Sequence, residues 1–329
     1  MSNEFLEPFA RLLGNISTPA AVRQAETEGA SAAMWGSIVE SGFLDAIVPE
    51  GEGGVGLTLA DMAPILMACG EHLLPLPFGE TMVARALLAQ AGISGLPDVP
   101  IALGPVGEGQ RPLSKVSAAL AADLHVLVQH GDTFGLYPSK PVAADGFRIV
   151  GAVPDLDAVP VASFARAGSD LFAWGAVLTS AQMAGAMARM LDTSLAYVND
   201  RQQFGHPLGK FQAIQHNMAV MAERVVAASV GARIGMGGSG LVIDRWRAAV
   251  AKCAANDAGV QCVAIAHAVH GAIGISEELD LQLYARRIKR WGLAFGSESY
   301  WSQVIGEMRA AEPGGTAVDF VRERMASAS

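Results

Sequence analysis

Apolar residues spaced three and four apart dominate two stretches of the chain, and the stretch between them lacks this spacing. Within residues 177–325 the longest series runs through Phe211, Ile214, Met218, Met221 and Val225. Such a series lines one face of a helix and is typical of the seam between helices of a bundle. Residues 1–93 contain shorter series of the same kind. Both ends of the chain are therefore expected to be helical.

The middle of the chain has a different pattern. Short runs of β-forming residues lie at 125–128, 134–137 and 147–150, between Gly, Pro and Asp residues. Runs bounded in this way predict a small antiparallel β unit. We therefore expect a mainly α-helical protein with a small β domain. Its parts would be an N-terminal helical domain at 1–93, a β domain at 94–176 and a C-terminal helical bundle domain at 177–329.

Turn-forming residues indicate where the C-terminal helices end. One helix should end near Asp200, and the next should begin near Lys210 after a turn rich in Gly and Pro. A glycine-rich stretch at 235–240 predicts a hairpin between two helices. A third long helix is expected from about Val242 to Val269, with Gly271 and Gly274 ending it.

Charge and composition narrow the function classes. Charged residues make up only 17% of the 329 residues, whereas about 25% is usual for soluble domains. Large faces are therefore expected to be buried against another subunit. The 32 acidic residues outnumber the 23 basic ones, giving a net charge of −9. This acidic balance argues against a nucleic-acid partner, which requires clustered basic residues.

The sequence also predicts where the protein is and what it does not bind. No apolar run reaches the roughly 18 residues that span a bilayer, so we expect no membrane insertion. The N-terminus carries early acidic residues and lacks a signal peptide, which predicts a cytoplasmic location. The three cysteines have no metal spacing and are expected to be buried free thiols. His267 and His270 could share a helix face, but no third ligand lies near them, so we expect no metal site.

The glycines at 51, 53 and 56 match the pattern G-x-G-x-x-G of dinucleotide-binding loops. Such a loop needs a preceding strand and a following helix. Residues 44–48 could form that strand, but Pro49 interrupts the entry and no alternation of strands and helices follows. A plain glycine turn between helices is the favoured interpretation.

The corner after Asp200 holds the residues best suited to bind a ligand. Arg201 could present its forked guanidinium to a phosphate, and Gln212 could offer its amide to a polar ring edge. The residues by themselves also allow an ordinary helix hairpin with a solvated arginine.

Residues 201–215 resemble the signature R-x-Q-F-G-x-P-L-x-x-F-Q-x-x-Q of the acyl-CoA dehydrogenase family. Residues 42–59 are similar to the turn in the first domain of that family, and residues 270–297 to its last conserved block. The resemblance implies a fold with an N-terminal helical domain, a middle antiparallel β domain and a C-terminal four-helix bundle. It also implies FAD as cofactor and acyl-CoA thioesters as substrates.

The resemblance implies which residues bind FAD. In this family each FAD lies between two subunits, and the neighbouring subunit holds the diphosphate and adenosine. Here the residues matching that half-site are Arg201, Gln203, Phe204, Gln212 and Gly271. The family glutamine of Q-x-x-G-G aligns with Ala268, and its second glycine aligns with Ala272. The cofactor contact of that glutamine is therefore lost.

The resemblance also implies that the usual catalytic base is missing. The family's E-G-T turn reads Phe295-Gly296-Ser297, and phenylalanine cannot accept a proton. Residues 171–186, where some relatives carry the glutamate instead, contain no acid. The β-domain signatures of the family are not visible, so the β domain is expected to be shortened or remodelled. Glu298, three residues after Phe295, is a weak substitute because one helical turn displaces it by about 5 Å.

The residues that match the nucleotide-binding half of the site are retained, whereas the catalytic glutamate and the β-domain signatures are missing. This difference indicates an assembly of two unlike subunits. The expected function is a subunit of an α2β2 acyl-CoA dehydrogenase, similar to those that oxidise steroid side chains. A second, larger subunit would supply the glutamate, and a separate acceptor would take the electrons. One alternative is a self-sufficient homotetramer that uses an acid such as Glu298. Another is a flavin-free scaffold or CoA-binding partner.

Overall fold

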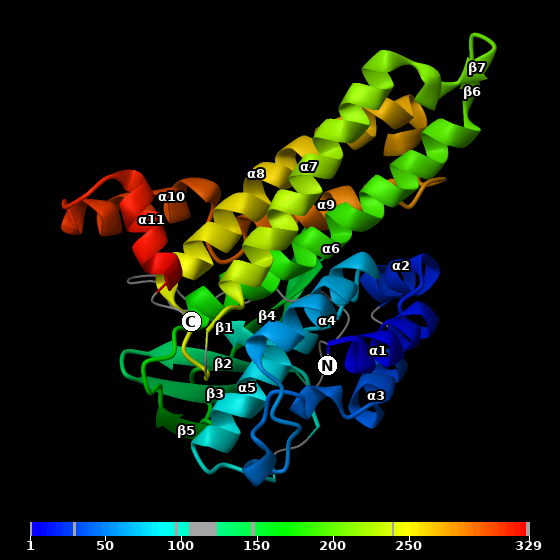
Figure 1. Cartoon of the computed structure of the whole chain (residues 1–329). Helices are drawn as coiled ribbons and strands as arrows, with labels where there is room; N and C mark the ends of the chain where they lie inside the picture. The colour runs from blue at the N-terminus through cyan, green and yellow to red at the C-terminus, as the bar shows by residue number, and fades with distance from the viewer. Residues whose placement is uncertain are drawn as a thin grey trace. The chain divides into compact units, whose positions relative to one another are not determined.

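The computed structural model describes residues 2–28, 31–95, 98–104, 124–145, 149–238 and 240–326 (Figure 1). The chain forms two compact units. The first contains residues 1–65, 74–175 and 239–243, and the second contains residues 66–73, 176–238 and 244–329. Along the chain, helices precede a group of strands, and longer helices follow. The domain boundaries expected near residues 93 and 176 stay predictions.

Helices form the N-terminal part of the first unit. They are α1 (Ser2–Ile16), α2 (Pro19–Glu28), α3 (Ala32–Glu40), the start of α4 (Leu59–Glu71) and α5 (Phe78–Gln90). Phe9 is fully buried, and its ring packs 4.7 Å from that of Phe43 and 4.8 Å from that of Phe78. Aromatic contacts of this kind contribute beyond the area they bury. The predicted helical pattern of this region is confirmed.

The glycine-rich segment at 51–56 is a turn. Residues Phe43–Asp45 and Glu50–Glu52 form short 3₁₀ turns, so no strand precedes the glycines. Gly53 and Gly56 have φ values of 89° and 69°, a conformation that favours glycine. The dinucleotide-loop alternative is therefore wrong, and the favoured interpretation as a turn is confirmed.

The sheet belongs to the first unit. Its strands are β1 (Ile101–Gly104), β2 (His125–His130), β3 (Thr133–Asp145), β4 (Ile149–Pro154) and β5 (Ala162–Ala165). The order is β1-β2-β3-β4, and β5 also pairs with β3. The predicted run at 125–128 lies in β2 and the run at 134–137 lies in β3. The third run is partly outside the described residues, and its end begins β4.

One pairing corrects the expectation of an antiparallel sheet. β1 and β2 are parallel, with Ile101 opposite His125 and Gly104 opposite Val128. The other described pairings of this sheet are antiparallel. Twenty residues separate β1 from β2, and a connection of a dozen or more residues permits a parallel crossover. The alternation of residue types along a strand carries no information about this direction.

Long helices make up the second unit. They are α6 (Leu171–Asp200, from residue 176 on), α7 (Gln212–Gly235), α8 (Arg245–His270), α9 (Leu281–Leu293), α10 (Glu298–Ala311) and α11 (Ala317–Ala326). The predicted helix end at Asp200 is confirmed, and α7 begins two residues after Lys210. A 3₁₀ turn at Gly271–Ile275 follows α8. In Figure 1, α7 and α8 run side by side.

Small residues let the helices of the second unit approach closely. A Cβ atom added to Gly231 would lie 2.8 Å from Cβ of Ala254, and one added to Gly235 would lie 2.7 Å from Cβ of Ala251. The crossing of α4 and α6 is closer still, because a Cβ on Gly185 would lie 1.8 Å from the carbonyl oxygen of Met67. Only glycine fits at this crossing without moving the backbone.

Two helices correct the expectation that no segment is long and apolar enough to cross a membrane. By length and composition alone, Leu171–Asp200 and Arg245–Ile275 meet this criterion. An 18-residue window of the first is 83% buried, as in a core helix, whereas the corresponding window of the second is 44% buried. The second helix therefore leaves much apolar surface uncovered in the isolated chain.

The three cysteines differ in how far they are buried. Cys69 and Cys262 are buried free thiols as predicted, and desolvation by burial raises the pKa of Cys262 to about 12. Cys253 is free but only half-buried, which corrects the expectation for that residue.

All five tryptophans are buried, two in the first unit and three in the second: Trp35, Trp174, Trp246, Trp291 and Trp301.

Candidate functional site

The corner between α6 and α7 is a short β-hairpin. β6 (Gln202–Gln203) pairs with β7 (His206–Pro207), so Phe204 and Gly205 form the two-residue loop. Their φ values of 53° and 82° are those of a type I′ turn. The Phe204 side chain is 89% exposed at the tip. The predicted Gly/Pro turn is thus a hairpin that displays an aromatic ring to solvent.

Arg201 is held at the base of this hairpin by its backbone. Its N–H donates to the Tyr197 carbonyl at 2.9 Å, and its carbonyl accepts from the Leu208 N–H at 2.8 Å. Arg201, Gln203 and Gln212 are exposed. Within the part of the chain that the structure describes, their side chains form no hydrogen bond or ion pair. These donors are therefore available to a ligand.

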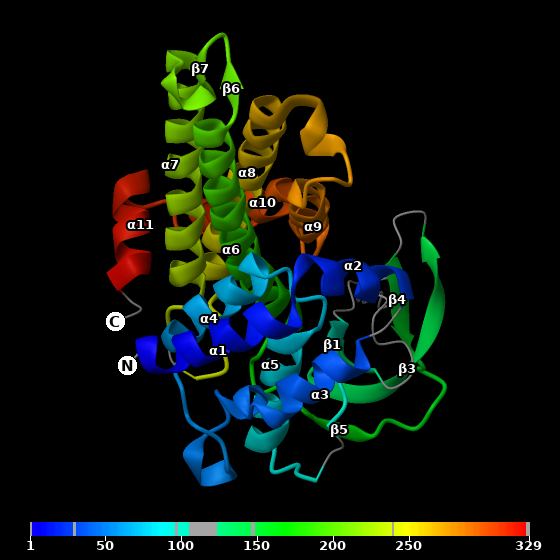
Figure 2. The same cartoon turned by 90° about the vertical axis from the view of Figure 1, so that its right-hand side faces the viewer.

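A ring contact joins this corner to the end of α8. Tyr197, one helical turn before Arg201, stacks on His270 with ring centroids 4.3 Å apart. His270 directly precedes Gly271, which closes α8 with a φ of 63°. Figures 1 and 2 both place the β6–β7 hairpin and the end of α8 at one end of the helices. The residues predicted to bind FAD, Arg201, Gln203, Phe204, Gln212 and Gly271, thus belong to elements that meet there.

The chemistry of this end fits an anionic nucleotide in most respects. Arg201 offers a forked charge for phosphate, and the two glutamines offer amide groups for polar ring edges. Gly271 is exposed, and a Cβ added there would meet nothing within 4 Å, so a ligand can approach the backbone. Ala268 and Ala272 are exposed but present only methyl groups. Neither side chain can donate or accept a hydrogen bond.

Two buried histidine nitrogens lie beneath this surface. His270 Nδ1 lies 2.9 Å from the Ala266 carbonyl oxygen, which fits a donated N–H and leaves Nε2 as an acceptor. His270 Nε2 and His267 Nδ1 are buried without a hydrogen-bond partner among the described residues. Desolvation by burial lowers the pKa of both histidines. Neutral rings therefore underlie this end of the bundle. The described residues contain no cluster of three or more metal-binding side chains.

The turn between α9 and α10 contains no catalytic carboxylate. Phe295 and Gly296 have φ values of 53° and 96°. Trp301 Nε1 donates to the Phe295 carbonyl at 2.8 Å, and a Cβ on Gly296 would lie 2.5 Å from that nitrogen. The turn is therefore fixed against the ring of Trp301. Glu298, the first residue of α10, is exposed to solvent.

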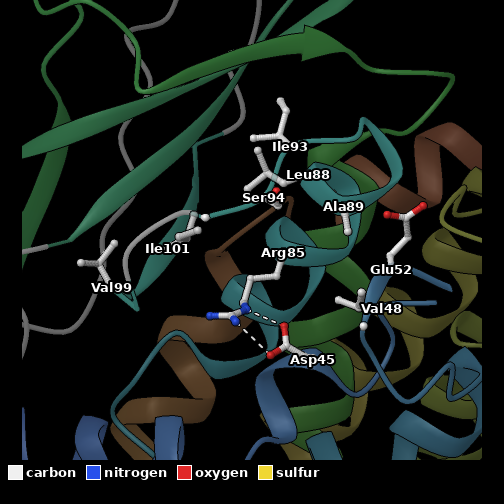
Figure 3. A pocket seen from close by; sticks show the side chains of 12 residues that line it. Asp45, Val48, Glu52, Arg85, Leu88, Ala89, Ile93, Ser94, Val99 and Ile101 are labelled. Carbon is white, nitrogen blue, oxygen red and sulfur yellow. Dashed lines mark hydrogen bonds and ion pairs between the residues drawn. The ribbon is translucent and has the colours of Figure 1, made fainter. Parts of the chain in front are cut away.

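The first unit contains a separate pocket of about 220 Å³ (Figure 3). Arg85 lines it and forms ion pairs with Asp45 at 2.7 Å and Asp98 at 2.8 Å. None of the residues predicted to bind FAD lines this pocket. The guanidinium of Arg85 is already paired with two carboxylates, and Glu52 adds another acid to the lining, so the pocket offers little to an anionic ligand.

Sequence reasoning missed one polar group in the second unit. Lys252 lies in α8 and is fully buried. The apolar spacing of the helix gave no signal for it, because a single lysine normally marks a solvent-facing position. Arg287 on α9 is buried as well, and its guanidinium carbon lies 5.4 Å from the centroid of the Trp291 ring.

Comparisons with known proteins agree with this architecture. Residues 164–308 match the family described as acyl-CoA dehydrogenase, C-terminal domain. Acyl-CoA dehydrogenase IpdE2 of Mycolicibacterium smegmatis is 33% identical over 292 residues, which cover 85% of this chain and 90% of the relative.

Solved structures of low sequence identity share the fold. A variant of the Tcur3481-Tcur3483 steroid ACAD matches with a TM-score of 0.76 and 23% identity, covering 96% of this chain and all of the other. The ChsE4-ChsE5 complex from Mycobacterium tuberculosis matches with a TM-score of 0.74 and 19% identity, and the match covers 95% of this chain and 98% of the other. The FAD complex of PigA matches with a TM-score of 0.70 and 17% identity, and the match covers 94% of this chain and 97% of the other. The identity to IpdE2 over most of both chains, together with the matched C-terminal domain, shows that this chain belongs to the acyl-CoA dehydrogenase family.

Proposed function

We propose that this chain is the smaller subunit of an α2β2 acyl-CoA dehydrogenase that binds FAD together with a second, larger subunit. The reaction is desaturation of the Cα–Cβ bond of an acyl-CoA, with a steroid side-chain thioester as the substrate class. A separate acceptor takes up the electrons. The observation that carries the proposal is the contrast between the available donors around Arg201 and the absence of a carboxylate at Phe295.

The role proposed for this chain is to bind the nucleotide end of the cofactor. Arg201 would pair with a phosphate, and its backbone bonds to Tyr197 and Leu208 hold it at the corner. The amide groups of Gln203 and Gln212 would form hydrogen bonds with polar ring edges of the nucleotide. The ring of Phe204 would pack against the cofactor or the partner subunit. When bound, FAD supplies the acceptor for the hydride.

The proton has to be removed by a group from outside this chain. A general base must come within about 2.6–3.2 Å of the proton it abstracts. The ring of Phe295 has no lone pair for this purpose, and Glu298 faces solvent at the start of α10. We therefore assign the catalytic glutamate to the partner subunit.

The names of similar proteins support a partner of the same family. The structures of Tcur3481-Tcur3483 and ChsE4-ChsE5 are each named for two proteins, and the former is called a steroid ACAD. The exposed apolar surface of α8 and the low charged fraction are consistent with a subunit that is buried in an assembly.

Flavin quantitation of purified proteins tests the proposal. This chain would be expressed alone and together with a larger acyl-CoA dehydrogenase subunit, and each product would be examined by native mass spectrometry and visible absorption. We expect the complex to contain one FAD per pair of unlike chains, and the single chain to contain little.

The other outcomes would support different functions. A single chain that is yellow and reduces dyes with an acyl-CoA would indicate a self-sufficient homotetramer. A complex without flavin would indicate a scaffold or CoA-binding partner, which the loss of the glutamine at Ala268 would explain. Either result would contradict the proposal.

Substitution of Glu298 by Gln tests the alternative base. We expect turnover of the complex to stay within about twofold of wild type, because an exposed carboxylate outside the reaction centre contributes little. Steady-state kinetics would measure this, with Glu307→Gln on the same helix as a matched control. A loss of about 10²-fold or more, as expected for a missing general base, would assign the base to Glu298.

A further inference from the structure

Lys252 is a buried amine without a carboxylate partner. None of its surface is exposed, although it lies in the middle of α8. Nζ donates to Thr179 Oγ1 on α6 at 3.1 Å and to the Trp291 carbonyl on α9. Neither of these acceptors carries a charge. Lys252 makes no ion pair within the described part of the chain.

The hydrogen bond from Lys252 to the Trp291 carbonyl lies at the C-terminal end of α9. Trp291 is one of the last four residues of α9, whose carbonyls lack partners within the helix. The Ala294 N–H satisfies the Arg290 carbonyl at 3.1 Å. Lys252, which comes from another helix, satisfies the Trp291 carbonyl. It therefore helps to fix where α9 ends and how the turn at 293–297 begins.

The number of hydrogen atoms on the amine decides which protonation state fits. A neutral amine has two N–H groups, which match the two acceptors present. An ammonium ion has three N–H groups, so one would lack an acceptor in this arrangement. Asn256, one helical turn along α8, has a buried Oδ1 without a partner among the described residues. No hydrogen bond joins it to Lys252 Nζ in this arrangement.

Close packing keeps water and counter-charges away from this region. A Cβ on Gly292, the residue after Trp291, would lie 3.5 Å from Asn256 Oδ1 and 3.9 Å from Met183 Cε. Residues 171–188 of α6 contain no ionisable side chain, and α9 contributes the cations Arg286, Arg287, Lys289 and Arg290. On α8, Asp257 is paired with Arg224 at 2.9 Å, and on α10 Glu298 is exposed. No acid therefore compensates a charge on Lys252.

We propose that Lys252 is a proton-linked positioning residue, which holds the end of α9 and the turn at 293–297 in the neutral form and holds them less firmly when protonated. This inference is independent of the proposed partner and cofactor, since it concerns contacts within one chain. Protonation places an unmatched N–H and an uncompensated charge in the core, and both are relieved when α9 moves away.

The direction of the pH effect follows from the pKa. Desolvation by burial lowers the pKa of Lys252 from 10.5 to about 7. Between these values the unfolded chain binds more protons than the folded chain, so stability rises with pH across this range. Below about pH 7 Lys252 is protonated in both the folded and the unfolded chain. The loss of folding free energy caused by the buried charge is then at its maximum.

Thermal unfolding between pH 6 and 9 tests this inference. We expect the Tm of the wild-type chain to rise by about 5 °C more over this range than that of Lys252→Met. Lys289→Met, at an exposed position on α9, should reproduce the wild-type profile. Parallel profiles for wild type and Lys252→Met would overturn the proposal.

Hydrogen exchange of the wild-type chain provides a measurement that does not depend on a variant folding. After correction for the intrinsic exchange rate, amides of residues 292–297 should be at least threefold less protected at pH 6 than at pH 8. Peptides from α11 should show no such change. Equal protection of residues 292–297 at the two pH values would overturn the proposal.

Discussion

Replacement of Arg201 by alanine is expected to weaken FAD binding to the complex by about 10- to 100-fold. A hydrogen bond to a charged group contributes roughly 1.5–3 kcal/mol, and the exposed guanidinium at the hairpin base is the cation we assign to the phosphates. Titration of the flavin-free complex with FAD, followed by fluorescence or calorimetry, would measure the change. The fold should be unaffected because the side chain is exposed and makes no hydrogen bond or ion pair within the described residues.

Two further variants make this result specific. Arg201→Lys should recover only part of the affinity, because an ammonium ion lacks the planar fork of guanidinium. Arg233→Ala removes a second exposed arginine, near the other end of α7, and should bind FAD like wild type. An unchanged Kd for Arg201→Ala would contradict the role given to this residue.

Replacement of Gly185 by alanine should destabilise the second unit by about 3 kcal/mol. The new methyl group would lie 1.8 Å from the carbonyl oxygen of Met67. Neither atom belongs to a flexible side chain, so α4 and α6 would have to separate. The midpoint of urea unfolding would measure the loss.

A glycine without neighbours is the control for this effect. Gly306 lies in α10, and a Cβ added there would meet nothing within 4 Å. Gly306→Ala should therefore be neutral or stabilise by up to about 1 kcal/mol, because alanine has the higher helix propensity. If both alanine variants unfolded at the same urea concentration as wild type, the close crossing of α4 and α6 would be incorrect.

The sequence predicted the helices because their apolar spacing and their turn residues are local signals. The end of α6 at Asp200 and the end of α8 at Gly271 follow from the chemistry of glycine and proline in the next residues. The direction of β1 could not be predicted in this way, because it depends on a crossover and not on residues within the strand. Contacts between distant segments, such as Gly185 with Met67, also leave no local pattern.

The candidate site was predicted only as a set of residues. The pattern R-x-Q-F-G marked Arg201, Gln203 and Phe204, but it contained no information about the end of α8. The stacking of Tyr197 on His270, which joins the two regions, links residues more than 70 positions apart. Lys252 was missed because burial of a lysine depends on which helices surround it, and a single lysine among apolar residues does not reveal this.

The burial of all five tryptophans provides an optical probe of each unit. Indole rings shielded from water emit at shorter wavelengths than rings in solvent, so unfolding should shift the emission to longer wavelengths. Trp35 and Trp174 would report on the first unit, and Trp246, Trp291 and Trp301 on the second. Replacing either group with phenylalanine would show whether the two units lose their structure in one transition or in succession.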